Sequence, residues 1–257
     1  MTGSEAADWW ATGICRMEPG VVELRGIPVQ DLIGTTGLVA TVWLLTRGSL
    51  PDPAEAALLE AALVAAVDHG PQAPSIAIAR MAVTCGVGLN NAIASGVNVL
   101  GDVHGGAGEQ CVALLNEIVE AEASGRSLTD AVAAAIAGYR YVPGFGHRFH
   151  PVDPRRDPLL ALVDQAVADG VVAGRHARAA RAVESALNAG RATPVPMNID
   201  GATAVIYAEL GFPPPLARGL FVLSRSVGIL AHAWEESNQG RRNKGPIPPS
   251  ILPTYRP

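Results

Sequence analysis

The chain has 257 residues, of which 49% are hydrophobic and 17% charged, so it is long enough to bury a core and too apolar for intrinsic disorder. Its 19 Lys and Arg against 24 Asp and Glu give a net charge of −5, which excludes a global positive field for nucleic acid or an anionic membrane. A local basic pocket for a small phosphorylated ligand stays open.

Apolar residues recur at helical spacing through almost the whole chain, so the expected fold class is all-α. Residues 21–28 are the best candidate for a short strand. The first clear helix is 53–68, which opens with a proline in its first turn and an acid just after it. Further helices are expected at 127–137, with Ser127 or Thr129 as N-cap, and at 159–172, 176–189 and 216–234.

The tail, residues 240–257, has five prolines and cannot form a continuous helix. It predicts an extended arm, either loose or laid across a neighbour. The chain shows no internal repeat that would indicate a solenoid or an array.

The cysteines and the N-terminal residues indicate a compartment. Cys15, Cys85 and Cys111 are far apart, without a CxxC pair, and form neither a disulfide framework nor a zinc site by themselves. This usage suits a reducing cytosol. The first residues, MTGSEAADWW, lack the apolar region of a signal peptide, and the most apolar stretches are shorter than the ~20 residues that span a bilayer. We therefore expect a cytoplasmic protein that does not enter a membrane.

Two histidines stand out by their surroundings. His104 lies in GDVHGGAGEQ, where glycines leave room for a ligand to approach the backbone and the imidazole together. The alternative is a loop histidine beside a flexible turn. His147 lies in PGFGHRFHPVDPRRD, whose arginines suit bidentate capture of a carboxylate or phosphate. The alternative there is a solvated basic loop.

Three further candidates each have a structural alternative. Asp200 lies at the start of an apolar helix, where an aspartate is most often an N-cap but can also serve as a general base. His69, in VDHGPQAPS, is either a ligand or a buried hydrogen-bonded histidine. Arg225 lies within an apolar helix, where an unpaired charge is costly, so it needs an anionic partner from the protein or from a ligand.

Several function classes lack their motifs. HRFH and HAWEE have no tight metal-ligand spacing and HExxH is absent, so no metal is expected. GFGHRF lacks the third glycine of a dinucleotide fingerprint, and the chain has neither a Walker A sequence nor a GxSxG elbow. Oxidoreductase, NTPase and hydrolase interpretations are therefore unsupported.

Taken in order, six segments resemble the citrate synthase superfamily, which includes citryl-CoA lyases. RGIPVQDLIGTTGLVATVWLLTRGSLP is similar to the family's N-terminal RG-x-P-I-x-D-L block, and DHGPQAPS to its DHE-x-N-x-S segment. VHGGAGEQ resembles LHGGANE, and GFGHRFHPVDPR resembles GFGHRVYK-x-x-DPR. NIDGATAVIYAELGFP resembles the N-V-D segment with its helix, and LSRSVGILAHAWEE resembles the SR-x-x-GW-x-AH helix. Together these blocks cover most of residues 25–236.

The resemblance implies a homodimer of helical subunits, each with a large and a small domain. The large domain would comprise residues 1–105 and 212–257, the second part ending in an extended C-terminal arm, and the small domain residues 106–211. It implies no permanently bound cofactor. The ligands would be a coenzyme A thioester as substrate and a 2-oxo acid, which is oxaloacetate in the best-known members.

The resemblance also implies a role for each candidate. Asp200 would remove a proton from the acyl-CoA α-carbon, and His104 would donate a hydrogen bond to the thioester oxygen. His147 would polarise the ketone of the oxo acid. A thioester α-C–H is a very weak acid, so a carboxylate base works only if the developing oxyanion is stabilised at once. The residues expected to hold the oxo acid are His69, Arg155 and Arg225.

Some features depart from the family pattern. The N-terminal block and DHGPQ are closer together than in typical citrate synthases, so the large domain is expected to be shortened. HRFHPVDPR is one residue shorter than the common form, and His150 and Pro151 replace the usual tyrosine and lysine. Gly245 stands where the family has an arginine that reaches the partner's site. The candidates to replace that arginine are Lys244, Arg242 and Arg241.

The favoured function is making or breaking a C–C bond between an acyl-CoA α-carbon and a 2-oxo acid. Cleavage of citryl-CoA to acetyl-CoA and oxaloacetate comes first, because compact chains of this kind resemble citryl-CoA lyases. The alternatives are a citrate or 2-methylcitrate synthase, which must also hydrolyse the thioester, and a non-catalytic acyl-CoA-binding relative. The joint presence of His104, His147 and Asp200 favours an enzyme.

Overall fold

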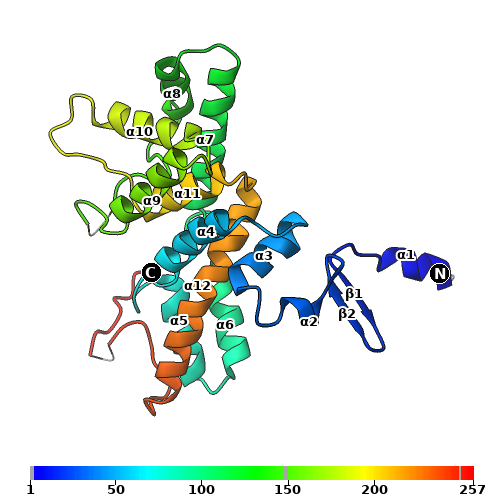
Figure 1. Ribbon diagram of the computed structural model, residues 1–257. Helices are drawn as coiled ribbons and strands as arrows, with labels where there is room; N and C mark the ends of the chain where they lie inside the picture. Colours follow the sequence, from blue (N-terminus) through cyan, green and yellow to red (C-terminus); the bar gives the residue numbers. More distant parts are fainter. Residues whose placement is uncertain (1–2, 148–149, 249) are drawn as a thin grey trace. The chain divides into compact units, whose positions relative to one another are not determined.

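The computed structural model describes residues 3–147, 150–248 and 250–257 and is mostly helical, which confirms the all-α prediction (Figure 1). The chain forms two compact units, Met1–Glu60 and Ala61–Pro257. The predicted division into a large and a small domain at residues 105 and 211 stays a prediction.

A small antiparallel sheet in the first unit departs from the predicted single strand at residues 21–28. Arg25 and Gly26, with φ of 50° and 80°, form a two-residue turn inside that segment. Two such residues with positive φ are typical of a type I′ hairpin turn, so the segment folds back on itself. The sheet has the order β1-β2-β3. Its strands are β1 (Cys15–Glu18), β2 (Val21–Leu24) and β3 (Ile27–Pro28).

The helices agree with the predicted ones to within a few residues at most ends. The expected helix at 159–172 begins earlier, at Arg156, and the one at 216–234 extends to Ser237. Ser127 is the N-cap of its helix and its hydroxyl accepts from the N–H of Asp130. The bounds are α1 (Gly3–Trp9), α2 (Val29–Leu32), α3 (Leu38–Arg47), α4 (Pro53–Ala66), α5 (Pro74–Thr84), α6 (Leu89–Val97), α7 (Ala107–Ala123), α8 (Leu128–Ile136), α9 (Arg156–Ala168), α10 (Arg175–Asn188), α11 (Ile199–Glu209) and α12 (Pro214–Ser237).

Two groups of helices make up the second unit. α5, α6 and α12 pack on one another around small and branched side chains such as Ala79, Ala92 and Ile229, whose size lets the helices approach closely. α7, α8, α10 and α11 form the other group, and α9 packs on α11. α11 is buried along almost its whole length. α12 also contacts α7 and α11, so it joins the two groups (Figure 1).

α12 is the one helix of the described chain that is long and apolar enough to cross a bilayer. Its most apolar window is 39% buried, and it packs against α5, α6 and α7. It also carries Arg225 in the buried part of its length. A helix packed inside a globular protein passes the same test of length and hydropathy, so the test alone is weak evidence for a membrane span.

Candidate active site

His104 lies in the loop between α6 and α7, which is closed by a hydrogen bond of 2.9 Å from the Gly101 N–H to the His104 carbonyl. The Ser75 N–H, at the start of α5, donates to Nε2 of His104 at 3.2 Å, and the Ser75 hydroxyl lies 3.0 Å from the same atom. A backbone N–H can only donate, so Nε2 is an acceptor and the proton of the neutral ring sits on Nδ1. Nδ1–H is therefore available as a donor to a ligand.

His147 and Asp200 are brought together by a short pairing of two loops. Phe145 pairs antiparallel with Met197, and the Asn198 amide donates at 2.6 Å to the carbonyl of Gly146. The segment before His147 thus lies against the segment that leads into α11. Backbone hydrogen bonds of 2.7 Å from the Gly146 N–H to the Pro196 carbonyl and of 2.9 Å from the Asn198 N–H to the Gly144 carbonyl hold the two segments together.

Gly144 is needed for this pairing. Its φ is 86°, and a Cβ there would lie 2.7 Å from the sulfur of Cys111 and 2.8 Å from Cα of Gly201. Residues other than glycine are strained in this conformation and would also collide with the start of α11. The glycine of the PGFG segment is therefore explained by packing.

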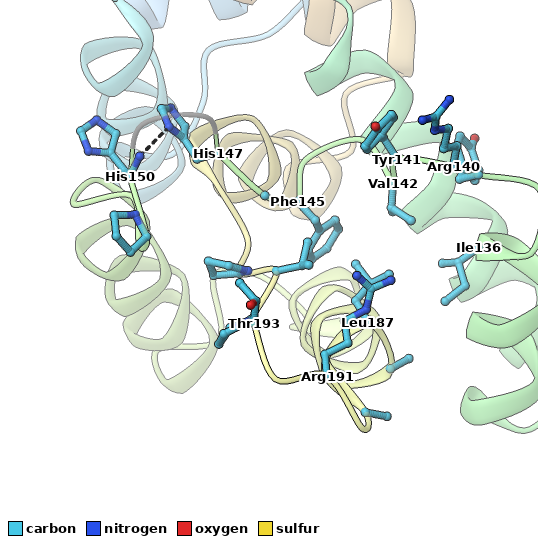
Figure 2. Close-up of a pocket in the computed structure, with 18 of the residues that line it drawn as sticks. Ile136, Arg140, Tyr141, Val142, Phe145, His147, His150, Leu187, Arg191 and Thr193 are labelled. Carbon is cyan, nitrogen blue, oxygen red and sulfur yellow. Dashed lines mark hydrogen bonds between the residues drawn. The ribbon is translucent and has the colours of Figure 1, made fainter.

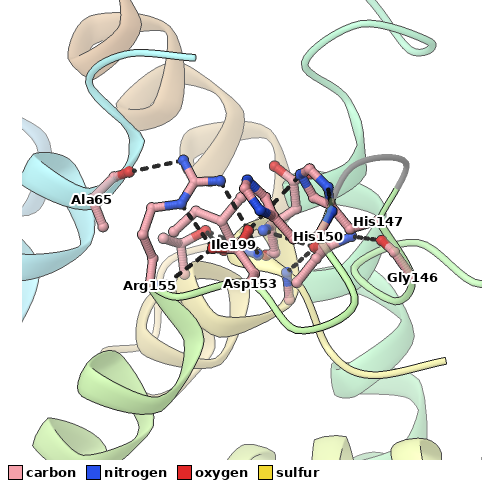
Figure 3. A network of polar contacts seen from close by, with 11 residues as sticks. Ala65, Gly146, His147, His150, Asp153, Arg155 and Ile199 are labelled. Atoms are coloured by element: carbon pink, nitrogen blue, oxygen red, sulfur yellow. Dashed lines mark hydrogen bonds and ion pairs between the residues drawn. The ribbon is translucent and has the colours of Figure 1, made fainter. Parts of the chain in front are cut away.

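The Asp153 carboxylate connects several parts of the site, and the sequence analysis did not select this residue (Figure 3). Its fully buried carboxylate receives two hydrogen bonds from the Arg155 guanidinium, at 2.9 and 2.8 Å, and one from the Ile199 N–H at 3.3 Å. Its Oδ2 also lies 4.0 Å from Nε2 of His147. Although burial alone raises it, these partners lower the pKa of Asp153 to about 2. The signal for this residue was present in the sequence, as the aspartate of the DPR segment.

Asp200 lies in the first turn of α11 but does not cap it. The N-cap is Asn198, whose side chain accepts from the N–H groups of Asp200 and Gly201. Burial raises the pKa of Asp200, while the charges of Arg225 and Arg155 lower it. Within the described part of the chain, the Asp200 carboxylate forms no hydrogen bond. The capping interpretation of this residue is therefore wrong, and its carboxylate is left for other chemistry.

The positive charge of Arg225 acts on several of the other candidate residues. The side chain is buried, donates from Nε to the Ala66 carbonyl at 3.2 Å and stacks over the Phe221 ring at 5.0 Å. Its charge acts on the titration of His69, His104 and Asp200. The sequence predicted an anionic partner for Arg225, and the Asp200 carboxylate interacts with its charge. Within the described residues the two side chains form no direct ion pair.

His69, His104 and His147 lie in surroundings that favour the neutral imidazole. Burial lowers the pKa of His69 and of His104, and Arg225 lowers both further. Burial and the neighbouring His150 lower the pKa of His147. An ordinary histidine has a pKa of about 6.5, so these shifts place all three below neutrality. Neutral imidazoles donate hydrogen bonds without placing a formal charge beside the carboxylate.

Two cavities meet at His147 and His150. The smaller, of about 300 Å³, is lined by His69, Gln72, His147, His150 and Arg155. The larger, of about 1470 Å³, runs from the same two histidines toward Arg140 and Arg191 (Figure 2). The His147 ring lies 5.9 Å from that of His69 and 4.6 Å from that of His150. Nδ1 of His147 accepts from the His150 N–H at 3.1 Å, which leaves the proton of the neutral ring on Nε2.

The sequence candidates thus converge, and the structure adds some residues to them. Lys244, a candidate to replace the missing arginine, is held by Glu236 at 2.7 Å, so its charge is already paired within the chain. In the described ranges, no group of three or more His, Cys, Asp or Glu side chains is arranged to hold a metal ion. The residues that sequence reasoning did not select, and that the site includes, are Ser75, His150 and Asp153.

Known protein families include one that matches most of this chain. The family model "Citrate synthase, C-terminal domain" matches residues 50–257. The chain belongs to the citrate synthase family. The resemblance seen in the six sequence segments is thereby confirmed.

Several proteins of known structure or curated sequence are similar to the chain. The structure of citryl-CoA lyase from Hydrogenobacter thermophilus matches with a TM-score of 0.84 and 31% identity, over 96% of this chain and 95% of that one. A probable ATP-citrate synthase subunit 1 from Neurospora crassa is 29% identical over 231 residues, which are 82% of this chain and 33% of that protein. A citrate synthase from Acidithiobacillus ferridurans is 29% identical over 201 residues, 75% of this chain and 49% of that protein. The chain thus spans a third to a half of the length of these two curated relatives.

Proposed function

We propose that the chain cleaves citryl-CoA to acetyl-CoA and oxaloacetate. The observation that carries this proposal is the junction of a small and a large cavity at His147. His69 and Arg155 line the smaller cavity, and the charge of Arg225 acts on His69, His104 and Asp200. The likeness to the Hydrogenobacter thermophilus lyase supports it, because it extends over nearly the full length of both chains. C–C bond chemistry next to a CoA thioester needs this arrangement of an acid pocket and a longer thioester pocket.

The smaller cavity is the proposed oxo-acid pocket. Its volume suits a four-carbon dicarboxylate, and His69 and His147 offer neutral donors for the ketone oxygen. Arg155 and Arg225 supply positive charge for the carboxylates. Arg155 is oriented by Asp153, so its guanidinium does not reorganise when the ligand arrives.

The larger cavity is the proposed CoA pocket. It is lined partly by apolar side chains such as Ile136 and Phe145, which suit the pantetheine arm, and by Arg140 and Arg191, which suit phosphate groups. The thioester end of the CoA would then reach the junction of the two cavities at His147. CoA is a substrate in this scheme, with no permanently bound cofactor.

The proposed chemistry uses each candidate at one atom. In cleavage, the proton of the citryl hydroxyl passes to Nδ1 of His147, which then gives up its hydrogen bond from the His150 N–H, as the C–C bond breaks and the ketone of oxaloacetate forms. The electron pair of that bond becomes an enolate of acetyl-CoA, whose oxygen receives the Nδ1–H of His104. The protonated form of Asp200, which burial favours by raising the pKa of this carboxyl, delivers its proton to the enolate carbon. Condensation runs through the same steps in reverse.

A citrate or 2-methylcitrate synthase is the second candidate, because the Acidithiobacillus ferridurans relative is a citrate synthase. The two are separated by incubating the chain with citryl-CoA and with acetyl-CoA plus oxaloacetate, while oxaloacetate and free thiol are followed. Oxaloacetate from citryl-CoA with little free CoA is the expected result. Rapid thiol release from acetyl-CoA plus oxaloacetate would instead establish a synthase. If neither reaction gives a product while the chain still binds CoA, the non-catalytic acyl-CoA-binding alternative is established.

We also propose a cytoplasmic homodimer that binds neither nucleic acid nor membrane. The support for the homodimer is an exposed apolar stripe on α12, formed by side chains spaced four, three and four residues apart and 42–58% exposed. Such a stripe on one helix face suits burial against an identical stripe of a second copy. Its members are Leu223, Val227, Leu230 and Trp234. The support against nucleic-acid and anionic-membrane binding is the net charge of −5.

Leu230→Glu is expected to convert the dimer to a monomer, because the new carboxylates would face each other across the two-fold axis in an apolar interface. Size-exclusion chromatography with light scattering measures the mass of the particle, which is compared with the 26.5 kDa of one chain. Leu162→Glu is the control, since Leu162 is 47% exposed on α9 and outside the stripe. A monomeric parent chain, or a dimeric Leu230→Glu variant, contradicts this interface.

A further inference from the structure

One face of α12 is fixed to the segment that leads from α4 to His69. Three of its positions, 225, 228 and 232, follow helical spacing and meet successive residues of that segment. At Gly228 the approach is so close that an added Cβ would lie 2.2 Å from the Val67 carbonyl oxygen, so no larger residue fits. The contacts, in chain order, join Ser224 to Leu63, Arg225 to Ala66, Gly228 to Val67 and His232 to Asp68.

The last of these contacts reaches the residue next to His69. Nε2 of His232 lies 3.1 Å from one carboxylate oxygen of Asp68, and the other oxygen accepts from the Gly70 N–H at 3.3 Å. Asp68 therefore connects α12 to the turn that carries His69. The pKa of Asp68 is lowered by the backbone and His232 hydrogen bonds, against an opposing effect of burial, so it is ionised at neutral pH.

The second nitrogen of His232 fixes its orientation and its tautomer. Nδ1 lies 3.0 Å from a guanidinium nitrogen of Arg80. A guanidinium can only donate, so Nδ1 accepts and Nε2 carries the proton that is donated to Asp68. The ring is thus held at both ends, in one of its two neutral forms.

Arg80 cannot move away from this contact easily. Its side chain is 10% exposed and forms ion pairs of 2.7 Å with Glu235 and 2.5 Å with Glu236. Glu236 is itself fully buried and also holds Lys244. The His232 ring therefore connects the Arg80 guanidinium, which is held by two ion pairs, to the Asp68 carboxylate beside His69.

We propose that His232 is a positioning residue for the oxo-acid pocket, which acts through Asp68 to set the place of the His69 ring. This inference rests on the proposed function, in which His69 binds the oxo acid. His232 itself does not line either cavity, and its effect on the ligand passes through the turn at residues 68–70.

His232→Leu is expected to raise the dissociation constant of oxaloacetate and its KM about tenfold, because a shift of one ångström or less at a binding group has effects of this size. The affinity for CoA and the turnover at saturating oxaloacetate should change less than about threefold, since Asp200 and His104 lie on other segments. A residue that merely stabilises the fold would not separate KM from kcat in this way.

His232→Gln is the rescue variant. Its amide oxygen accepts from Arg80 and its amide nitrogen donates to Asp68, which reproduces both contacts of the neutral ring. Oxaloacetate affinity should return to within about threefold of the parent. In an Asp68→Ala background, His232→Leu should have no further effect on oxaloacetate affinity, because the connection is already broken. His176→Leu, a histidine of α10 that lines neither cavity, is the control.

Calorimetric titration with oxaloacetate and steady-state kinetics test the inference, and thermal melting shows that each variant is folded. Unchanged oxaloacetate affinity in folded His232→Leu, with the parent chain binding oxaloacetate, overturns the positioning role alone. A parent chain that neither binds nor turns over oxaloacetate overturns the proposed function and this inference with it. If His232→Leu does not fold, a His232→Gln variant with affinity as poor as that of Asp68→Ala overturns the role.

Discussion

Asp200→Asn is expected to lower turnover about 1,000-fold in both reaction directions while the affinity for CoA stays within about threefold of the parent value. The amide keeps the shape of the side chain and the N-terminal turn of α11, which Asn198 caps independently. The amide is too weak a base to take the proton of the α-carbon and too weak an acid to return it. The loss therefore falls on the chemical step, and it is measured as kcat for citryl-CoA cleavage together with calorimetric binding of CoA.

The pH dependence gives a second check on Asp200. An ordinary aspartate titrates near pH 3.9, and burial raises the pKa of Asp200 above that value. In condensation the carboxylate must be ionised, so the rate should fall as the pH drops through this raised pKa. In cleavage the protonated form acts, so the rate carried by Asp200 should fall as the pH rises above it. In Asp200→Asn, we expect both of these pH dependences to disappear: the fall of the condensation rate at low pH and the fall of the cleavage rate at higher pH.

Asp130→Asn provides the matched control for this substitution. Asp130 also lies in the first turn of a helix, but it is exposed and serves the cap of α8. Its replacement should leave kcat within about twofold, since Asp130 is exposed and lines neither of the two cavities. Full turnover by Asp200→Asn would show that another group carries the proton.

The helices were predictable because their apolar spacing and caps are local properties of the sequence. Pro53 and Ser127 mark their helix starts as expected. The sheet at the N-terminus was missed in part because its turn depends on Arg25, a residue rarely found with positive φ and not a sign of a turn. Its guanidinium, bonded to the Leu45 carbonyl at 2.7 Å, holds that conformation from a distance that no local pattern reports.

The site was predictable to the extent that it lies in motifs. His104, His147 and Asp200 were found by their segments. The partners of His147 and the capping residue beside Asp200 lie in those same segments, whereas the partner that fixes His104 lies far away in the chain. Ser75 is 29 residues from His104 and determines which nitrogen of that ring donates. Asp200 was ambiguous from the sequence, because a first-turn aspartate and an N-cap look alike until the capping Asn198 is seen.

Asp153→Asn is expected to destabilise the chain by about 3 kcal/mol and to lower activity at least tenfold, because it breaks a buried ion pair and leaves Arg155 without its partner. An amide cannot accept from both guanidinium nitrogens and from the Ile199 N–H at the same time. Three elements of the site would therefore loosen together: the His147 loop, Arg155 and the start of α11. Chemical denaturation measures the stability, and citryl-CoA cleavage the activity.

The stability difference should also depend on pH in a defined direction. The pKa of Asp153 is about 2 in the folded chain and about 3.9 when unfolded, so its ionised form stabilises the fold above pH 4. That contribution is lost as the pH falls from about 4 toward 2, and the gap between the parent and Asp153→Asn should narrow over the same range. Asp157→Asn is the control, because Asp157 pairs with Arg156 on the surface with 70% of its side chain exposed, and its loss should cost less than about 0.5 kcal/mol. If the two substitutions lowered the folding stability equally at pH 7, the buried Asp153 carboxylate would not stabilise the site as we propose. The position of His147 would then depend on other contacts.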